Sequence, residues 1–167
     1  VLVIDKKINE FQEISKALQA CIANNCNKVL VMCHDATEEV IATTILNNQK
    51  NGFKIVLVKN PTMGKNRNDV LDDIAILTGG KLLSEANGIS LSKVVDVENF
   101  GKAKRIIVTS DTTTIIDGQG NKDAIENRIK ELETVYNNDK KLQITIAGQE
   151  MKQRIGRIRG KVAVITV

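Results

Sequence analysis

The stretch that decides the fold is AKRIIVTSDTTTIIDGQG, from Ala103 to Gly120. Two runs within it are rich in β-branched residues, which predicts strands over Ala103 to Thr109 and over Thr112 to Ile116. The dipeptide Asp117-Gly118 is typical of a hairpin turn and is expected to end the second strand. The three threonines are better interpreted as strand formers than as part of a phosphate-binding loop, because no glycine-rich turn or helix start follows them. The glycines after Asp117 also lack the spacing of a dinucleotide fingerprint.

Upstream of this stretch, strand-like and helix-like patterns alternate. Short apolar runs predict buried strands, and the segments between them carry apolar residues at helical spacing. The predicted strands are Val1 to Ile4, Val29 to Cys33 and Lys54 to Val58, and the predicted helices are Asn9 to Ala23, Thr37 to Gln49 and Asn68 to Leu77. Asp35 is a plausible N-cap of the second helix, and Gly79 with Gly80 should end the third. This order is typical of a parallel sheet covered by helices.

The remaining segments complete a single α/β unit. Further strands are predicted over Lys81 to Leu83, Ser90 to Val95 and Val162 to Val167. Further helices are predicted over Lys122 to Tyr136 and Glu150 to Ile158. No linker rich in Pro, Gly or Ser separates two parts. We therefore predict one α/β domain over residues 1–167, with a central, mainly parallel sheet flanked by helices and additional β-hairpin strands.

Composition excludes several classes of function. The chain has 167 residues, of which 42% are hydrophobic, enough for one substantial core. Only 2% are aromatic, so there are few platforms on which nucleic-acid bases could stack, and no nucleic-acid partner is expected. The net charge of +4 comes from interspersed signs, which favours solubility rather than a polyanionic partner. No apolar run approaches the about 18 residues that span a bilayer, so no membrane partner is expected.

Cysteine and histidine do not form a metal site in the sequence. Cys21, Cys26 and Cys33 are odd in number and are not spaced as zinc ligands, so neither a disulfide framework nor a zinc site is expected. His34 is the single histidine and has no second ligand pair nearby in sequence. A reducing compartment fits this pattern best.

No catalytic constellation is found either. Adjacent acids on a helix point in different directions, so pairs such as Glu38-Glu39 and Asp72-Asp73 are expected to serve solvation or the helix dipole. Ser84 and Ser110 would both depend on His34 to complete a triad. Enzyme activity within this chain is therefore not expected.

The two early helices have apolar arcs wider than one buried stripe. In the first, Leu18 and Ile22 are displaced around the helix from Ile14 and Cys21. In the second, apolar side chains spread in the same way beyond the face of Val40 and Thr44. Two interpretations remain open: the helices expose an apolar groove between them, which commonly marks an interaction site, or both are simply well buried.

Six collinear motifs carry a resemblance to a known family. They are VLVIDKKI, ATEEVIATTILNN, VKNPTMGKNR, LDDIAILTGG, the AKR to IIDG stretch, and the closing GKVAVITV. Over nearly the whole chain they resemble the chaperonin-60 family (GroEL-type, group I). The resemblance implies an apical, polypeptide-binding domain whose C-terminal end runs into the start of the hinge to the intermediate domain. A groove between two helices of that domain would bind non-native polypeptides and the mobile loop of a GroES-type co-chaperonin.

The resemblance also assigns residues. The apolar groove positions fall on Leu18, Ile41, Ile45 and Leu46, with Ile22 beside them on the first helix and Asn47 at the position of an asparagine beside the groove. Ser15 stands where the family usually has leucine. Thr62-Met63 and the stretch Asn137 to Gln153 also depart from the family pattern.

For the whole protein, the resemblance implies a homo-oligomeric ring that uses ATP and Mg. Those sites belong to segments outside this chain, so the chain itself is expected to hold no cofactor or metal and to be monomeric. Frequent Asn and Lys are typical of AT-rich coding DNA, which favours a eukaryotic organelle, a plastid or the mitochondrial matrix, over a bacterial cytoplasm.

One alternative comes from a different class of function. A small-molecule-binding α/β domain would use the carboxyl ends of its strands, near Cys33, His34 and Asn60. An extended apolar peptide would distinguish the two functions.

Overall fold

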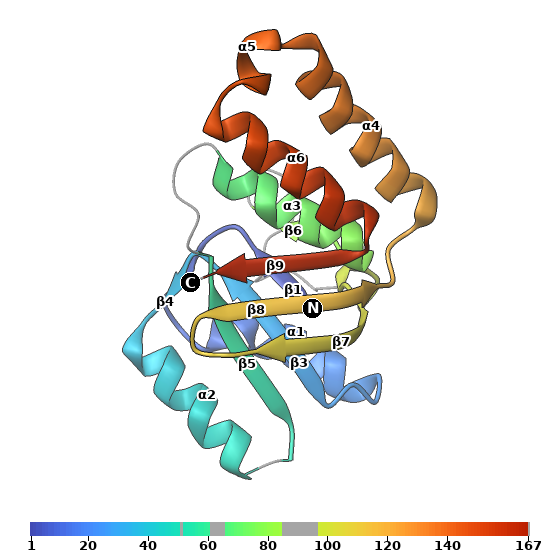
Figure 1. The fold of residues 1–167 in the computed structure, drawn as a ribbon. Helices are drawn as coiled ribbons and strands as arrows, with labels where there is room; N and C mark the ends of the chain where they lie inside the picture. The colour runs from blue at the N-terminus through green and yellow to red at the C-terminus, as the bar shows by residue number, and fades with distance from the viewer. Residues whose placement is uncertain (51, 61–65, 85–96, 167) are drawn as a thin grey trace.

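A computed structural model describes residues 1–50, 52–60, 66–84 and 97–166 (Figure 1). At its centre lies a parallel sheet with the strand order β5-β3-β1-β6. These strands are β1 (Leu2–Ile4), β3 (Lys28–Cys33), β5 (Lys54–Lys59) and β6 (Leu82–Leu83). The longest pairing runs in register from Lys28 beside Lys54 to Cys33 beside Lys59. The predicted α/β class with a parallel sheet is confirmed.

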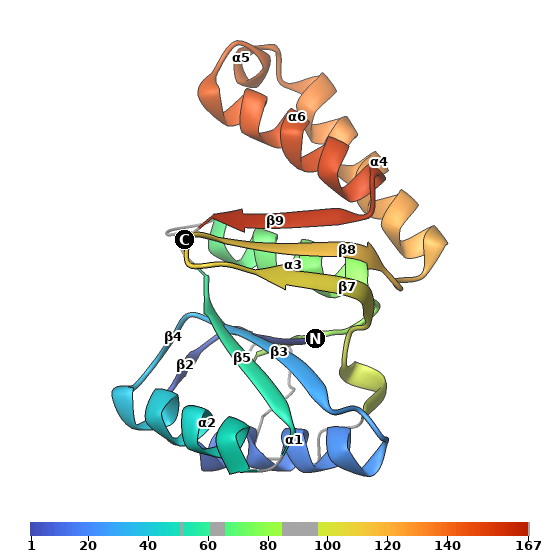
Figure 2. The ribbon, with the colours of Figure 1, turned by 60° about the horizontal axis from the view of Figure 1, so that its bottom comes forward.

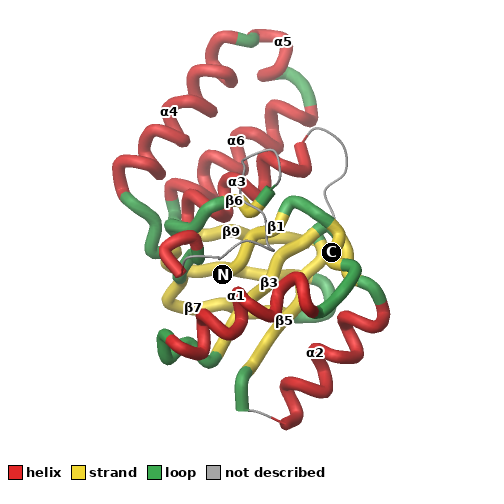
Figure 3. Tube along the Cα trace, turned by 180° about the vertical axis from the view of Figure 1, so that it is seen from behind, coloured by secondary structure: helices red, strands yellow, loops and turns green. Residues whose placement is uncertain are grey.

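Alternation along the strands sends side chains to two different cores. In β3, Val29, Val31 and Cys33 face one cluster, whereas Leu30 and Met32 face another. The first cluster is covered by α1 (Gln12–Ala23) and α2 (Glu38–Lys50), which lie on the same side of the sheet (Figures 2 and 3). The second is covered by α3 (Asn66–Thr78) and by a second sheet. Both faces of the inner strands β1 and β3 are therefore buried, as their near-continuous apolar sequences require.

The second sheet is antiparallel, with the order β7-β8-β9. Its strands are β7 (Ala103–Val108), β8 (Thr112–Gly118) and β9 (Val162–Thr166). The prediction of a hairpin turn at Asp117-Gly118 is wrong, because the turn lies at 109–111, where the Thr109 N–H donates to the Thr112 carbonyl at 2.8 Å. Asp117 and Gly118 instead lie inside β8, with Asp117 at φ +52°. Gly118 is needed there because a Cβ would lie 2.3 Å from the Leu77 carbonyl oxygen of α3.

A helical layer covers the outer side of α3 and β9. It consists of α4 (Lys122–Asn138), the short α5 (Lys140–Gln143) and α6 (Ile146–Arg159). Asn121, Asp139 and Thr145 cap these three helices through their side-chain oxygens. The predicted helices are confirmed, although α6 begins earlier than expected because Thr145 is its cap. None of the described helices is both long enough and apolar enough to cross a bilayer.

The start of α2 differs from the prediction. Asp35 does not cap α2: it lies in β4 (Asp35–Ala36), which pairs in parallel with β2 (Lys7–Ile8). The Thr37 hydroxyl takes the capping role and accepts from the Val40 N–H at 3.4 Å.

The third helix ends as predicted at Gly79, whose φ is +78°. A short 3₁₀ helix, η1 (Val97–Asn99), precedes β7. The predicted strand Ser90 to Val95 and the Thr62-Met63 departure lie outside the described residues.

Candidate functional site: an apolar cleft beside α1 and α2

A cavity of about 640 Å³ opens between α1, the C-terminal end of α2 and the start of β5. Four residues of its α1 wall, Phe11, Ser15, Leu18 and Ile22, follow the spacing i, i+4, i+7 and i+11. Residues at this spacing share one face of a helix. The other walls come from Asn25, Cys26 and Asn27 after α1, from Asn47 on α2, and from Gly52, Phe53 and Ile55. The predicted site residues Ser15, Leu18, Ile22 and Asn47 therefore lie around one cavity.

The orientation of α1 is fixed at its start by Glu13. One carboxylate oxygen of Glu13 accepts from the N–H groups of Asn9 at 2.8 Å and Glu10 at 3.0 Å, and the other pairs with Lys6. Partial burial alone would raise the pKa of Glu13, but the Lys6 bond and the two backbone bonds outweigh it and hold that pKa below its usual value. The ionised carboxylate also suits the positive end of the helix dipole.

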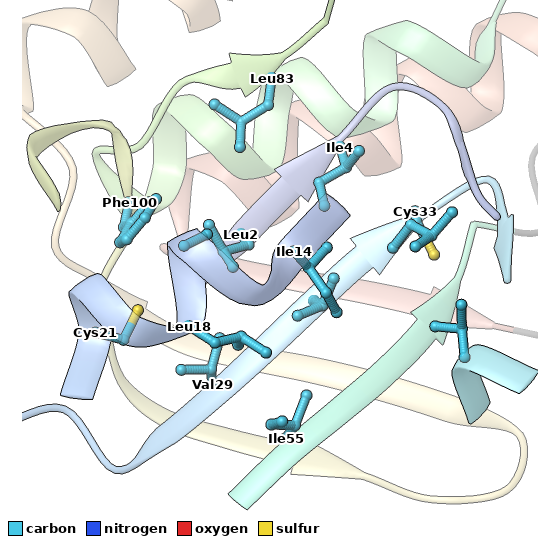
Figure 4. Close-up of a cluster of buried hydrophobic side chains, with 14 of the residues drawn as sticks. Leu2, Ile4, Ile14, Leu18, Cys21, Val29, Cys33, Ile55, Leu83 and Phe100 are labelled. Atoms are coloured by element: carbon cyan, nitrogen blue, oxygen red, sulfur yellow. The ribbon is translucent and has the colours of Figure 1, made fainter. Parts of the chain in front are cut away.

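Leu18 departs from the expectation that it would be open to water. Its side chain is only 4% exposed and belongs to the core, where it lies beside Val29 of β3 (Figure 4). The buried stripe of α1 is Ile14, Ala17, Leu18 and Cys21, so Leu18 sits at the edge of the stripe that adjoins the cavity. It forms the floor of the cleft rather than an exposed contact.

The position of α2 depends on an asparagine that the sequence analysis did not single out. The Asn48 amide nitrogen donates to the Ile55 carbonyl at 2.8 Å, and the Ile55 N–H donates to the Asn48 oxygen at 2.7 Å. This paired contact attaches the C-terminal half of α2 to β5. On the adjoining side of the helix, Asn47 lines the cavity and donates to the Thr43 carbonyl at 2.8 Å.

Large apolar side chains remain exposed around the cleft. Ile22 on α1 is 55% exposed, and on α2 Ile41 is 45%, Ile45 52% and Leu46 52% exposed. Ile41 and Ile45 are four residues apart and so are neighbours on one helix face. Only Ile22 of these four lines the cavity itself; the three α2 residues extend the apolar surface along the outside of α2. We call these four residues, together with Ser15, Leu18 and Asn47, the groove surface.

The other residues considered from the sequence, Asp73 and the group Cys33, His34 and Asn60, are held by hydrogen bonds and ion pairs. Asp73 was expected to be a solvating carboxylate, but it is buried and bonds to Arg128 of α4 at 2.9 Å and to Arg154 of α6. Cys33, His34 and Asn60 do meet at the carboxyl end of the sheet. There His34 pairs with Asp5 at 2.6 Å, and the Asn60 N–H donates to the Cys33 carbonyl at 2.8 Å.

In the described part of the chain, no three His, Cys, Asp or Glu side chains gather so as to hold a metal ion.

Comparison with known proteins identifies the relatives of this chain. No family model matches it. It is 34% identical, over all 167 residues, to the chaperonin GroEL 3 of Psychromonas ingrahamii. The chain belongs to the GroEL-type chaperonin family. It spans 30% of the length of this chaperonin relative.

Two solved chaperonin structures have a similar fold. They are two crystal forms of the chaperonin gp146 from the bacteriophage EL 2 (Pseudomonas aeruginosa), both obtained in the presence of ATP-BeFx. Their TM-scores are 0.60 and 0.64 at 15% and 18% identity, and each match covers 98% of this chain and 32% of the solved one. The family resemblance and the fold class predicted from the sequence are thus confirmed.

Proposed function

We propose that the groove surface binds exposed apolar segments of non-native polypeptides, as one segment of a protein-folding chaperonin. The observation that carries this proposal is the exposure of Ile22, Ile41, Ile45 and Leu46 on two neighbouring helices beside a cavity. Large apolar side chains exposed on neighbouring elements commonly mark an interaction site. Membership of the chaperonin family supports a folding role for the whole protein.

The chemistry of the surface suits a ligand without a fixed sequence. Apolar contact is non-directional and stabilises binding by about 25 cal/mol for each Å² removed from water. Asn25 and Asn27 also line the cavity, and their side-chain amides are proposed to bond to the backbone of an extended segment bound there. Because ordering the peptide opposes binding, one such surface should hold a client weakly and with little selectivity.

The same surface is proposed to take the mobile loop of a co-chaperonin. An apolar loop that occupies the groove would compete with the client and release it. The ring assembly and the ATP hydrolysis that would drive this cycle are assigned to segments of the whole protein outside this chain. This chain is proposed to supply the binding surface and no catalysis.

The proposal is tested by titrating the chain with a fluorescently labelled, extended apolar peptide and measuring anisotropy. In the double variant Ile22→Glu/Ile45→Glu we expect binding to be lost, because two charges would have to be desolvated in the complex. Both side chains are more than half exposed, so the melting curve followed by circular dichroism should be nearly unchanged.

Ile144→Glu provides a matched control. Ile144 is 86% exposed and follows α5, at the end of the molecule away from α1 and α2 (Figures 1 and 2). This variant should bind the peptide like the parent chain. If it loses binding as fully as the double variant, or if the double variant still binds, the groove surface is not the binding site.

A further inference from the structure

Two of the cysteines meet where α1 ends. The Asn25 N–H donates to the Ile22 carbonyl at 3.0 Å, and the Cys26 N–H donates to the Cys21 carbonyl at 2.9 Å. Asn25 has φ +57°. These bonds and this left-handed residue define a Schellman motif, which brings the side chain two positions beyond the C-cap against the one three positions before it. Here those side chains are Cys26 and Cys21.

The two thiols have unequal access to solvent. Cys26 is exposed, and its Sγ lies 3.4 Å from the Lys28 carbonyl oxygen. Cys21 is buried in the core beneath α1. Burial raises the pKa of the Cys21 thiol to about 11, and the neighbouring Cys26 thiol adds to this rise. An oxidant from solution therefore reaches Cys26 first, and Cys21 can react only with a group already attached to Cys26.

We propose that Cys21 and Cys26 form a reversible dithiol–disulfide site for small-molecule disulfides such as glutathione disulfide. The Cys26 thiolate attacks one sulfur of the oxidant, forms a mixed disulfide and releases one glutathione thiolate. Cys21 then loses its proton to solvent, attacks the Cys26 sulfur and displaces the second glutathione. Two protein thiols are oxidised to one disulfide, and one glutathione disulfide is reduced to two glutathione molecules.

The fold supports this ring closure through backbone geometry. A backbone hydrogen bond already joins the two cysteines, so little chain entropy remains to be lost when the sulfurs connect. The third cysteine is not part of the site: Cys33 is buried at the carboxyl end of β3, and Figure 4 shows Cys21 and Cys33 at opposite ends of the core cluster.

The position of the site gives the pair a consequence for binding, and this step alone rests on the proposed function. Cys26 and Ile22 both line the cavity. A glutathione held on Cys26 would therefore lie at the cavity wall and hinder a bound peptide. By displacing that adduct, Cys21 would keep the cleft open during oxidation.

The test exposes the folded 167-residue chain to glutathione disulfide, quenches with acid and measures intact mass and peptide maps. The parent chain should lose two hydrogens, carry no adduct and yield a Cys21–Cys26 cross-link that a reductant reverses. Cys21→Ser should instead accumulate one glutathione on position 26, and Cys26→Ser should react at least tenfold more slowly. Cys33→Ala is the matched control and should behave like the parent.

The proposal is overturned if the parent chain retains the adduct as fully as Cys21→Ser does, or if Cys33→Ala abolishes the cross-link. Peptide titration of the same samples is a separate readout. If the cross-link forms as expected but the chain binds no peptide, the redox site is supported and the proposed function is overturned. If the chain binds peptide but forms no cross-link, the proposed function is supported and the redox site is overturned.

Discussion

At the scale of single residues, Leu18 and Ile45 represent the buried and the exposed parts of the groove surface. Leu18 is 4% exposed and Ile45 52% exposed. Leu18→Ala should lower the free energy of unfolding by about 2–4 kcal/mol, because it leaves a cavity between α1 and β3. Ile45→Ala should change it by no more than about 0.5 kcal/mol. Urea titration measures both values, and equal losses would show that Ile45 is also a core residue.

This contrast also shows what the helical period can predict. The period correctly assigned Ile14 and Cys21 to the buried face of α1. It also placed Leu18 and Ile22 at the margin of that face, but it could not tell which of them a strand would cover. Val29 of β3 covers Leu18, and that neighbour is set by the packing of the sheet rather than by the sequence of the helix.

At the scale of secondary-structure elements, Asp73 joins three helices. Its carboxylate on α3 accepts from Arg128 of α4 and Arg154 of α6, and the Arg128 and Arg154 side chains are each 19% exposed. Asp73→Asn should cost about 3 kcal/mol of stability, because two partly buried guanidinium groups would lose their most buried counter-charge and keep only the more exposed Asp69 and Glu131. Differential scanning calorimetry would measure this loss.

The neighbouring Asp72 provides the control for Asp73. Burial raises the pKa of Asp72, so its charged form is disfavoured in the folded state and Asp72→Asn should be neutral or slightly stabilising near pH 7. Equal losses in the two variants would contradict the assigned role of Asp73.

The elements themselves were largely predictable, whereas their long-range partners were not. Apolar runs and helical spacing gave the alternating strands and helices, because these are local properties of the chain. The partners of Asp73 lie 55 and 81 residues further along the chain, so no local pattern could indicate them. The hairpin turn was misplaced for a related reason: the Asp117-Gly118 pair matches a turn signal, but the close approach of α3 is what requires the glycine.

At the scale of the whole molecule, the layers place two different surfaces at opposite ends. The groove surface lies on α1 and α2, and the α4–α6 layer lies beyond the second sheet (Figure 2). The α4–α6 layer therefore does not cover the groove surface. The sequence predicted the strands of both sheets. It could not predict that the antiparallel sheet would pack on one face of the parallel sheet. That contact joins Ile115 and Ile165 to residues far away in the sequence, such as Val3 and Met32.

A weak surface of this kind should gain affinity when several copies act on one client. Displayed on a ring-forming scaffold, the chain should bind a long unfolded polypeptide about 10² to 10⁴ times more tightly than it does as a monomer, because later contacts become intramolecular. A short peptide that reaches only one groove should show no such gain. Surface plasmon resonance with both ligands measures the two ratios. If the short peptide gains as much as the long polypeptide, the increase comes from the scaffold and not from multivalent binding at the groove surface.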